Sequence, residues 1–285
     1  MSVAIVNTCD KMRQLSERAR KEGRIVGFVP TMGALHEGHL SLVRIARKRA
    51  DVVVVSIYVN PAQFTPGEDF EKYPRMVDED VRLLGTVGAD YVFTPDDAMI
   101  YPEGYATYVT VEGLTEGLCA RSRPIHFRGV TTVVSKLFNI VRPHLAVFGQ
   151  KDFQQLAVIR RMTADLNFDI EIIGAPIVRE ADGLAMSSRN AYLSPEGRVQ
   201  ATAISRSLGE AQNLVNAGET HPDEIIEHVR RVIGEAPLAE VEYIELVDPD
   251  SLIPLTEVTE RALLALAVRF GQTRLIDNSV LTVPE

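Results

Sequence analysis

Two histidines near the N-terminus stand where a ligand phosphate could be bound. His36 and His39 lie in Pro30–His39, PTMGALHEGH, between a predicted strand and a predicted helix. Ligands of open α/β sheets bind beyond the carboxyl ends of strands, where free N–H groups at the next helix start attract phosphate. The glycines let the backbone approach a ligand closely. Either imidazole could therefore donate a hydrogen bond to a transferring phosphoryl group.

Other interpretations of these histidines stay open. They could bind metal, although the spacing is not the His-Glu-x-x-His of zinc proteases and the sequence shows no third ligand. They could also be surface side chains without a role. Neither a G-x-G-x-x-G segment nor a Walker P-loop occurs, which disfavours a dinucleotide site and a P-loop kinase.

A glutamine follows the strongest strand of the sequence. Gln63 lies in Ser56–Phe64, SIYVNPAQF, where Asn-Pro ends the strand that contains four consecutive valines. Its amide can both donate and accept, as recognition of a hydroxy acid requires. A glutamine in a polar loop is the competing interpretation.

Two later segments carry charges suited to a nucleotide. In Phe148–Gln155, FGQKDFQQ, Lys151 could meet phosphate as a point charge, and Asp152 could cap a helix or bind ribose hydroxyls. In Ala181–Asn190, ADGLAMSSRN, two serines and an arginine suit a triphosphate and its pyrophosphate product. That second segment could equally be a helix-capping linker.

The elements that must position these residues follow from hydrophobic periodicity. Continuous apolar runs suit strands covered on both faces, and alternation of strands with helices predicts βαβ units and a doubly wound parallel sheet. Strands are expected at 24–30, 51–60, 91–93, 145–148 and 169–173, and helices at 39–50, 78–87, 127–141 and 153–166.

The pattern changes near Pro176. Helices are expected at 195–217 and 222–234, and strands at 241–247 and 262–268. Helices followed by strands indicate a small α+β domain. We therefore expect an α/β domain over residues 1–175 and a smaller C-terminal α+β domain over residues 176–285.

Composition excludes several classes of protein. The 285 residues are 46% hydrophobic and 24% charged, with a net charge of −9 and scattered basic residues, which disfavours a nucleic-acid partner. No apolar run reaches the roughly 18 residues of a membrane span, and the apolar run at 3–6 is too short for a secretory signal. Two cysteines, Cys9 and Cys119, fit a reducing cytoplasm.

Seven segments, taken in order, resemble the pantothenate synthetase (pantoate–β-alanine ligase) family. They are PTMGALHEGH, SIYVNPAQF, KYPR, RPIHFRGV, FGQKDFQQ, DGLAMSSRN and RLIDN, and the similarity runs from about residue 24 to residue 278. The first of them also resembles the HIGH motif of the nucleotidyltransferase superfamily. The chain departs from the family pattern at Leu118-Cys119-Ala120, where Leu-Glu-Gly is usual, and at Ile125.

The resemblance implies a ligase. Pantoate and ATP would form a pantoyl-adenylate, and β-alanine would then yield pantothenate and AMP. His39, His36, Lys151, Ser188 and Arg189 would be catalytic, and Gln63 and Gln155 would hold pantoate, with Gln63 also near β-alanine. The residues expected to bind ATP are Met32, Gly33, Ala34, Leu35, His36, Glu37, Gly38, His39, Gly149, Gln150, Lys151, Asp152, Val178, Met186, Ser187, Ser188 and Arg189.

The resemblance also implies a Rossmann-like N-terminal domain, a C-terminal lid and a cytoplasmic homodimer. Mg²⁺ would be carried on the ATP phosphates, because no dedicated protein metal site is evident. Two other functions compete. One is a nucleotidyltransferase of the same fold that forms no amide, and the other is a non-enzymatic ATP-binding sensor.

Overall fold

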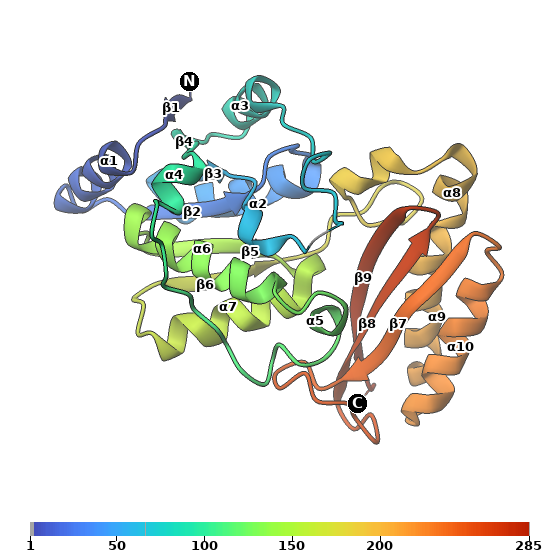
Figure 1. Ribbon diagram of the computed structural model, residues 1–285. Coiled ribbons are helices and arrows are strands. Elements are labelled where there is room, and N and C mark those ends of the chain that lie inside the picture. The colour runs from blue at the N-terminus through green and yellow to red at the C-terminus, as the bar shows by residue number, and fades with distance from the viewer. Residues whose placement is uncertain (1–2, 66, 285) are drawn as a thin grey trace. The chain divides into compact units, whose positions relative to one another are not determined.

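The computed structural model describes residues 3–65 and 67–284. Its contacts group these residues into two compact units (Figure 1). Unit 1 comprises residues 1–112, 123–150 and 155–176, and unit 2 comprises residues 113–122, 151–154 and 177–285. Residues 1, 2, 66 and 285, which the expected domains 1–175 and 176–285 include, lie outside the described residues.

Unit 1 is built on a six-stranded parallel sheet in the order β1-β4-β3-β2-β5-β6. This arrangement confirms the predicted doubly wound parallel sheet. Between β2 and β5 the strand order reverses direction, and such a switch point is where open α/β sheets bind ligands. In chain order the strands are β1 Ala4–Val6, β2 Val26–Thr31, β3 Val52–Ile57, β4 Tyr91–Phe93, β5 Leu145–Gly149 and β6 Glu171–Ala175.

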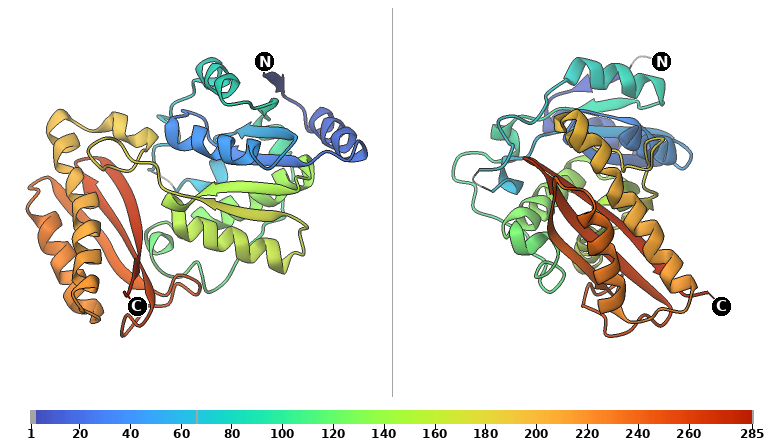
Figure 2. Two further views of the ribbon diagram at one scale, coloured as in Figure 1. Left: turned by 180° about the vertical axis from the view of Figure 1, so that it is seen from behind. Right: turned by 90° about the vertical axis from the view of Figure 1, so that its right-hand side faces the viewer.

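Helices cover both faces of this sheet (Figure 2). On one face, α2 and α3 share a core with alternate strand residues such as Val53 and Val55. On the other, Phe138 of α6 meets Phe28 and Phe148 edge to face, with centroids 6.4 Å apart in both pairs. The helices are α1 Cys9–Lys21, α2 Glu37–Arg47, α3 Val77–Thr86, α4 Asp97–Ile100, α6 His126–Val141 and α7 Phe153–Asp165.

Unit 2 is built on a three-stranded antiparallel sheet of β7 Ala239–Val247, β8 Arg261–Phe270 and β9 Thr273–Thr282. Helices α9 Thr202–Asn216 and α10 Pro222–Gly234 lie side by side along one face of this sheet (Figure 2). The smaller helices of this unit are α5 Cys119–Ser122 and α8 Pro195–Gln200. This composition confirms the predicted α+β class of the smaller part.

The helices and strands of the structure differ from the expected ones in three respects. The helix expected at 195–217 is two helices, α8 and α9, which meet at Ala201. Strand β9 was not expected, because its sequence places Asp277 and Asn278 together and such residues are depleted in strands. Neither β1 nor α1 was expected. No helix of the described chain has both the length and the apolar character needed to cross a membrane.

Candidate active site

The backbone of the loop that follows β2 is hydrogen-bonded to a buried carboxylate, that of Asp80. Gly33 and Ala34 have φ of 81° and 51°, so the chain turns sharply before α2. The N–H groups of Ala34 and Leu35 donate to the Asp80 carboxylate over 3.0 and 2.8 Å. Burial raises the pKa of Asp80, and the two backbone hydrogen bonds oppose that shift. Asp80 therefore fixes the loop that leads into the two histidines.

The histidines themselves form the start of α2. His36 is the N-cap residue, and its Nδ1 accepts the N–H of Gly38 over 3.1 Å. His39 Nδ1 accepts the N–H of His36 over 3.3 Å, and the two rings lie 4.1 Å apart. A neutral imidazole whose Nδ1 accepts carries its hydrogen on Nε2. The local fold therefore gives both rings an Nε2–H donor.

Hydrogen bonds at both the oxygen and the nitrogen of the Gln63 side-chain amide fix its orientation. It ends a short 3₁₀ helix, Pro61–Gln63, in which Asn60 Oδ1 accepts the N–H of Ala62. Asn60 Nδ2 donates to Gln63 Oε1 over 3.2 Å, and Gln63 Nε2 donates to Met32 Sδ over 3.0 Å. The orientation of the Gln63 amide is thus set, while a second lone pair and a second N–H stay available for a ligand.

The start of α6 clamps the backbone of this loop. The Gln63 carbonyl accepts from His126 Nδ1 over 2.9 Å and from Arg123 Nη2 over 3.3 Å. Arg123 also pairs with both oxygens of Glu68, over 2.8 and 2.6 Å. Burial favours the neutral Glu68 acid, but the hydrogen bonds from Arg123 and Thr65 win and lower its pKa to about 2.

Gly129 is the position where α6 approaches this loop most closely. A Cβ on Gly129 would lie 2.3 Å from the Ala62 carbonyl oxygen and 2.6 Å from Gln63 Cα. Alanine normally stabilises a helix interior by about 1 kcal/mol over glycine. Here we expect Gly129→Ala to lower the melting temperature and to weaken binding of any ligand held by Gln63, because backbone atoms must move.

A matched variant separates the clash from helix propensity. Gly209 lies in α9 with nothing within 4 Å of an added Cβ, so Gly209→Ala should leave kinetics unchanged and raise the melting temperature slightly. Thermal unfolding and steady-state kinetics are measured for both variants. Equal behaviour of the two would contradict the proposed clamp on Gln63.

Several further candidate residues lie on unit 2, on a hairpin spanning residues 178–186 and the turn that follows it. Met186 N–H donates to the Val178 carbonyl over 3.0 Å and closes the hairpin. Ser187 Oγ accepts the N–H of Arg189 over 3.3 Å and caps the 3₁₀ helix Ser188–Tyr192. Ser187 therefore has a local capping role in addition to any ligand contact.

Comparison with known proteins matches these segments to one family. The family model described as pantoate-beta-alanine ligase matches residues 4–280. A pantothenate synthetase from Pelotomaculum thermopropionicum is 55% identical over 277 residues, covering 97% of this chain and 98% of that protein. The chain belongs to the pantoate–β-alanine ligase family.

Solved structures of this ligase family have the same fold. The pantothenate synthetase of Thermus thermophilus superposes with a TM-score of 0.94 at 44% identity, covering 99% of this chain and 100% of that one. A pantoate-beta-alanine ligase from Francisella tularensis has a TM-score of 0.80 at 32% identity, covering 98% and 97% of the two chains. Its structure is described as complexed with beta-gamma ATP and beta-alanine.

The site residues expected from the family motifs are distributed over the two units. Segment Met32–His39, Gln63 and Gln155 lie in unit 1, as do Gly149 and Gln150. Lys151 and Asp152 lie in unit 2 with Val178 and the Met186–Arg189 segment. Within the units, the structure joins Met32 to Gln63, His36 to His39, and Val178 to Met186. Gln155 is half-buried on α7.

The sequence analysis did not predict the residues that hold the expected site residues in place. Asp80 lies in an acidic helix start, VDED, that looks like ordinary dipole compensation. Asn60 lies in a turn signal, although its amide also reaches the Gly129 carbonyl over 3.1 Å. Arg123 and His126 lie in RPIHFRGV, a segment that carried the resemblance but no assigned role.

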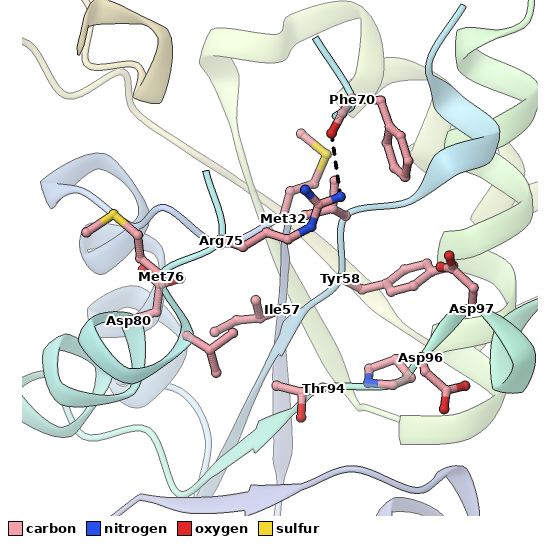
Figure 3. Close-up of a pocket in the computed structure, with 14 residues that line it drawn as sticks. Met32, Ile57, Tyr58, Phe70, Arg75, Met76, Asp80, Thr94, Asp96 and Asp97 are labelled. Atoms are coloured by element: carbon pink, nitrogen blue, oxygen red, sulfur yellow. Dashed lines mark hydrogen bonds between the residues drawn. The ribbon is translucent and has the colours of Figure 1, made fainter. Parts of the chain in front are cut away.

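A pocket of about 320 Å³ lies beyond the carboxyl ends of β3 and β4 (Figure 3). Of the residues expected to bind substrates in the family, only Met32 and Gly33 line it. Its wall includes the carboxylates of Asp80, Asp96 and Asp97. Arg75 also lines the pocket, but the three acidic side chains outnumber it and would repel a triphosphate, so the ATP phosphates are not placed there.

A metal site built by the protein itself would need several donor side chains close together. Among them, no group of three or more His, Cys, Asp and Glu side chains could hold a metal ion. Mg²⁺ binds to proteins through few carboxylates when substrate phosphates supply most of its ligands.

Proposed function

We propose that the chain condenses pantoate with β-alanine to pantothenate, consuming ATP and releasing AMP and pyrophosphate. The observation that carries this proposal is the family match over residues 4–280, together with 55% identity across 97% of the chain. The ATP and β-alanine named for the Francisella tularensis relative agree with the proposed substrates.

The proposed reaction has two steps. A pantoate carboxylate oxygen attacks the α-phosphorus of ATP, so an O–P bond forms while the bond to pyrophosphate breaks. The β-alanine amine then attacks the acyl carbon, the C–O bond to AMP breaks, and the amine loses a proton. Adenylation is needed because a carboxylate oxygen is a poor leaving group. Catalysis of such a transfer rests on positioning and on charge stabilisation.

The histidines supply hydrogen bonds to the phosphates in this proposal. Because Nδ1 of each ring accepts a backbone N–H, each ring carries its hydrogen on Nε2, the atom that would donate to a phosphate oxygen. Such a donor is effective where negative charge develops on a phosphoryl oxygen. We assign this role to His39 first and to His36 second.

The other roles follow the family motifs. Lys151 and Arg189 neutralise the phosphates, the Ser188 hydroxyl donates a hydrogen bond to them, and the Val178 backbone contacts adenine. Mg²⁺ on the phosphates supplies further charge neutralisation. Gln63 and Gln155 bind pantoate, and Gln63 also lies near β-alanine. The fixed amide of Gln63 supports this role, because a preset donor and acceptor lose little freedom when a hydroxy acid binds.

The test is pantoate-dependent exchange of labelled pyrophosphate into ATP with β-alanine absent. A reversible adenylate step predicts exchange, and later addition of β-alanine predicts AMP and an amide product. No exchange by a folded, ATP-binding protein would reject the adenylate and leave the sensor interpretation. Other carboxylic acids serve as controls for the choice of pantoate.

Two further properties are proposed from the resemblance. The chain acts as a homodimer in the cytoplasm, without a nucleic-acid or membrane partner. The free thiols of Cys9 and Cys119 support a reducing compartment. Sedimentation equilibrium gives the oligomeric state, and a monomer at micromolar concentration would reject the dimer.

A further inference from the structure

Strand β9 of unit 2 carries two adjacent buried polar residues that no assigned role explains. Asp277 is 2% exposed and Asn278 is 6% exposed. They pair with Leu266 and Ala265 of β8. Burying polar groups is unfavourable unless hydrogen bonds compensate, so the partners of this pair indicate what the pair is for.

Asp277 holds the base of the 178–186 hairpin. Its carboxylate accepts two hydrogen bonds from the Arg179 guanidinium, over 2.6 and 3.1 Å. Arg179 also donates to the Gly183 carbonyl over 3.1 Å, and it bridges Ala185 across the hairpin. The hairpin contains Val178 and Met186 at its two ends, so the ion pair fixes both.

Asn278 holds a different segment. Its Nδ2 donates to the Lys151 carbonyl over 2.8 Å. Asn278 itself is tied to its neighbour, because its N–H donates to Asp277 Oδ1 over 2.8 Å. Two consecutive residues of one strand thus bind the two chain segments of unit 2 that carry the expected phosphate contacts.

We propose that Asp277 and Asn278 are positioning residues that set the distance between Lys151 and the 178–189 segment and thereby the affinity for ATP. This inference rests on the proposed function, since it takes both segments to contact ATP. Neither side chain touches the nucleotide. The pair acts through its hydrogen bonds to Arg179 and to the Lys151 backbone. These bonds set the position of the Lys151 amine relative to the hairpin.

The hairpin has a second support that keeps its variants folded. Arg198 donates to Glu180 and to Asp182, over 2.6 Å in each case. Asn190 donates to Glu180 and to the Ala185 carbonyl, over 2.8 and 3.1 Å. Loss of the Asn278 contact should therefore change the spacing of the two segments more than the conformation of either one.

Asn278→Asp is the sharpest variant. It keeps the side-chain shape but turns a donor into an acceptor that faces the Lys151 carbonyl, so the two oxygens repel each other. We expect ATP affinity to weaken by about tenfold or more, with the KM for pantoate changed less than about twofold. Asn278→Ala, which only removes the donor, should fall between this variant and wild type.

A matched control comes from another ion pair of the same sheet, in which both side chains are half-buried. Glu242 on β7 accepts two hydrogen bonds from Arg274, both over 2.9 Å, and contacts neither proposed ATP segment in these bonds. Glu242→Gln and Asp277→Asn should both lower the melting temperature. Only Asp277→Asn should also weaken ATP binding.

Titration calorimetry with ATP measures affinity without turnover, and saturation kinetics measure the two KM values. A tenfold loss of ATP affinity in folded Asn278→Asp, absent from Glu242→Gln, supports the inference. Unchanged ATP affinity in Asn278→Asp and Asp277→Asn would overturn it and leave the pair a structural element only. Failure of wild type to exchange pyrophosphate would instead reject the proposed function, because ATP affinity is read separately.

Discussion

His39→Ala is expected to lower the rate of pantoate-dependent pyrophosphate exchange by about 100-fold or more. The reason is the Nε2–H donor, which the backbone fixes by donating the His36 N–H to His39 Nδ1. Alanine removes that donor and half of the cap at the start of α2. Steady-state exchange rates at saturating ATP and pantoate measure the effect.

Two variants sharpen this expectation. His39→Gln places an amide nitrogen near the position of Nε2, so it should retain more activity than His39→Ala. His221 is a matched control, because its side chain is 78% exposed and pairs with Glu219 on unit 2. His221→Ala should exchange pyrophosphate at the wild-type rate. A wild-type rate in folded His39→Ala would remove His39 from the mechanism.

Lys151→Ala is expected to lower turnover by a comparable factor, about 100-fold or more. Its ammonium is the point charge that meets the phosphates in the proposed reaction. Asn278 holds the Lys151 carbonyl and not its side chain, so the backbone should keep its place when the side chain is shortened. The loss should appear in kcat at saturating ATP, because charge stabilisation grows in the transition state.

Lysine variants elsewhere show whether the effect is local. Lys48 is exposed at the end of α2, and Lys48→Ala should match wild type in kcat. Lys151→Arg keeps the charge but spreads it over a planar group, so it should recover only part of the rate. A purely ATP-affinity effect in Lys151→Ala, with kcat intact, would contradict stabilisation of the transition state.

Long apolar runs made most of unit 1 predictable. The valines of β3, Val52–Val55, are all buried, as a strand covered on both faces requires. Elements with few inward-facing residues were not predictable. Helix α1 buries only Met12, Ser16 and Ala19, and β1 is a three-residue edge strand. Their positions come from tertiary packing, which periodicity does not report.

Candidate ligand-binding residues could be proposed from the sequence more readily than the residues that hold them in place. Motif order indicated the His36–His39 turn and Gln63, because their chemistry suits phosphate and a hydroxy acid. Asp80 is 46 positions from Ala34, whose N–H it accepts, and such a contact depends on how α3 packs. Likewise, His126 acts on Gln63 through a backbone carbonyl, which any residue at that position would offer. No side-chain pattern encodes that bond.

The path of the chain limits how this molecule could be taken apart. Unit 2 receives residues 113–122 and 151–154 as well as 177–285, so the chain passes between units after residues 112, 122, 150, 154 and 176. A gene fragment beginning at residue 177 would therefore omit Lys151 and the acceptor of the Asn278 amide. Unit 2 therefore cannot be exchanged between relatives as one continuous segment of sequence. Recombination between relatives at a single crossover would separate residues that this unit needs together.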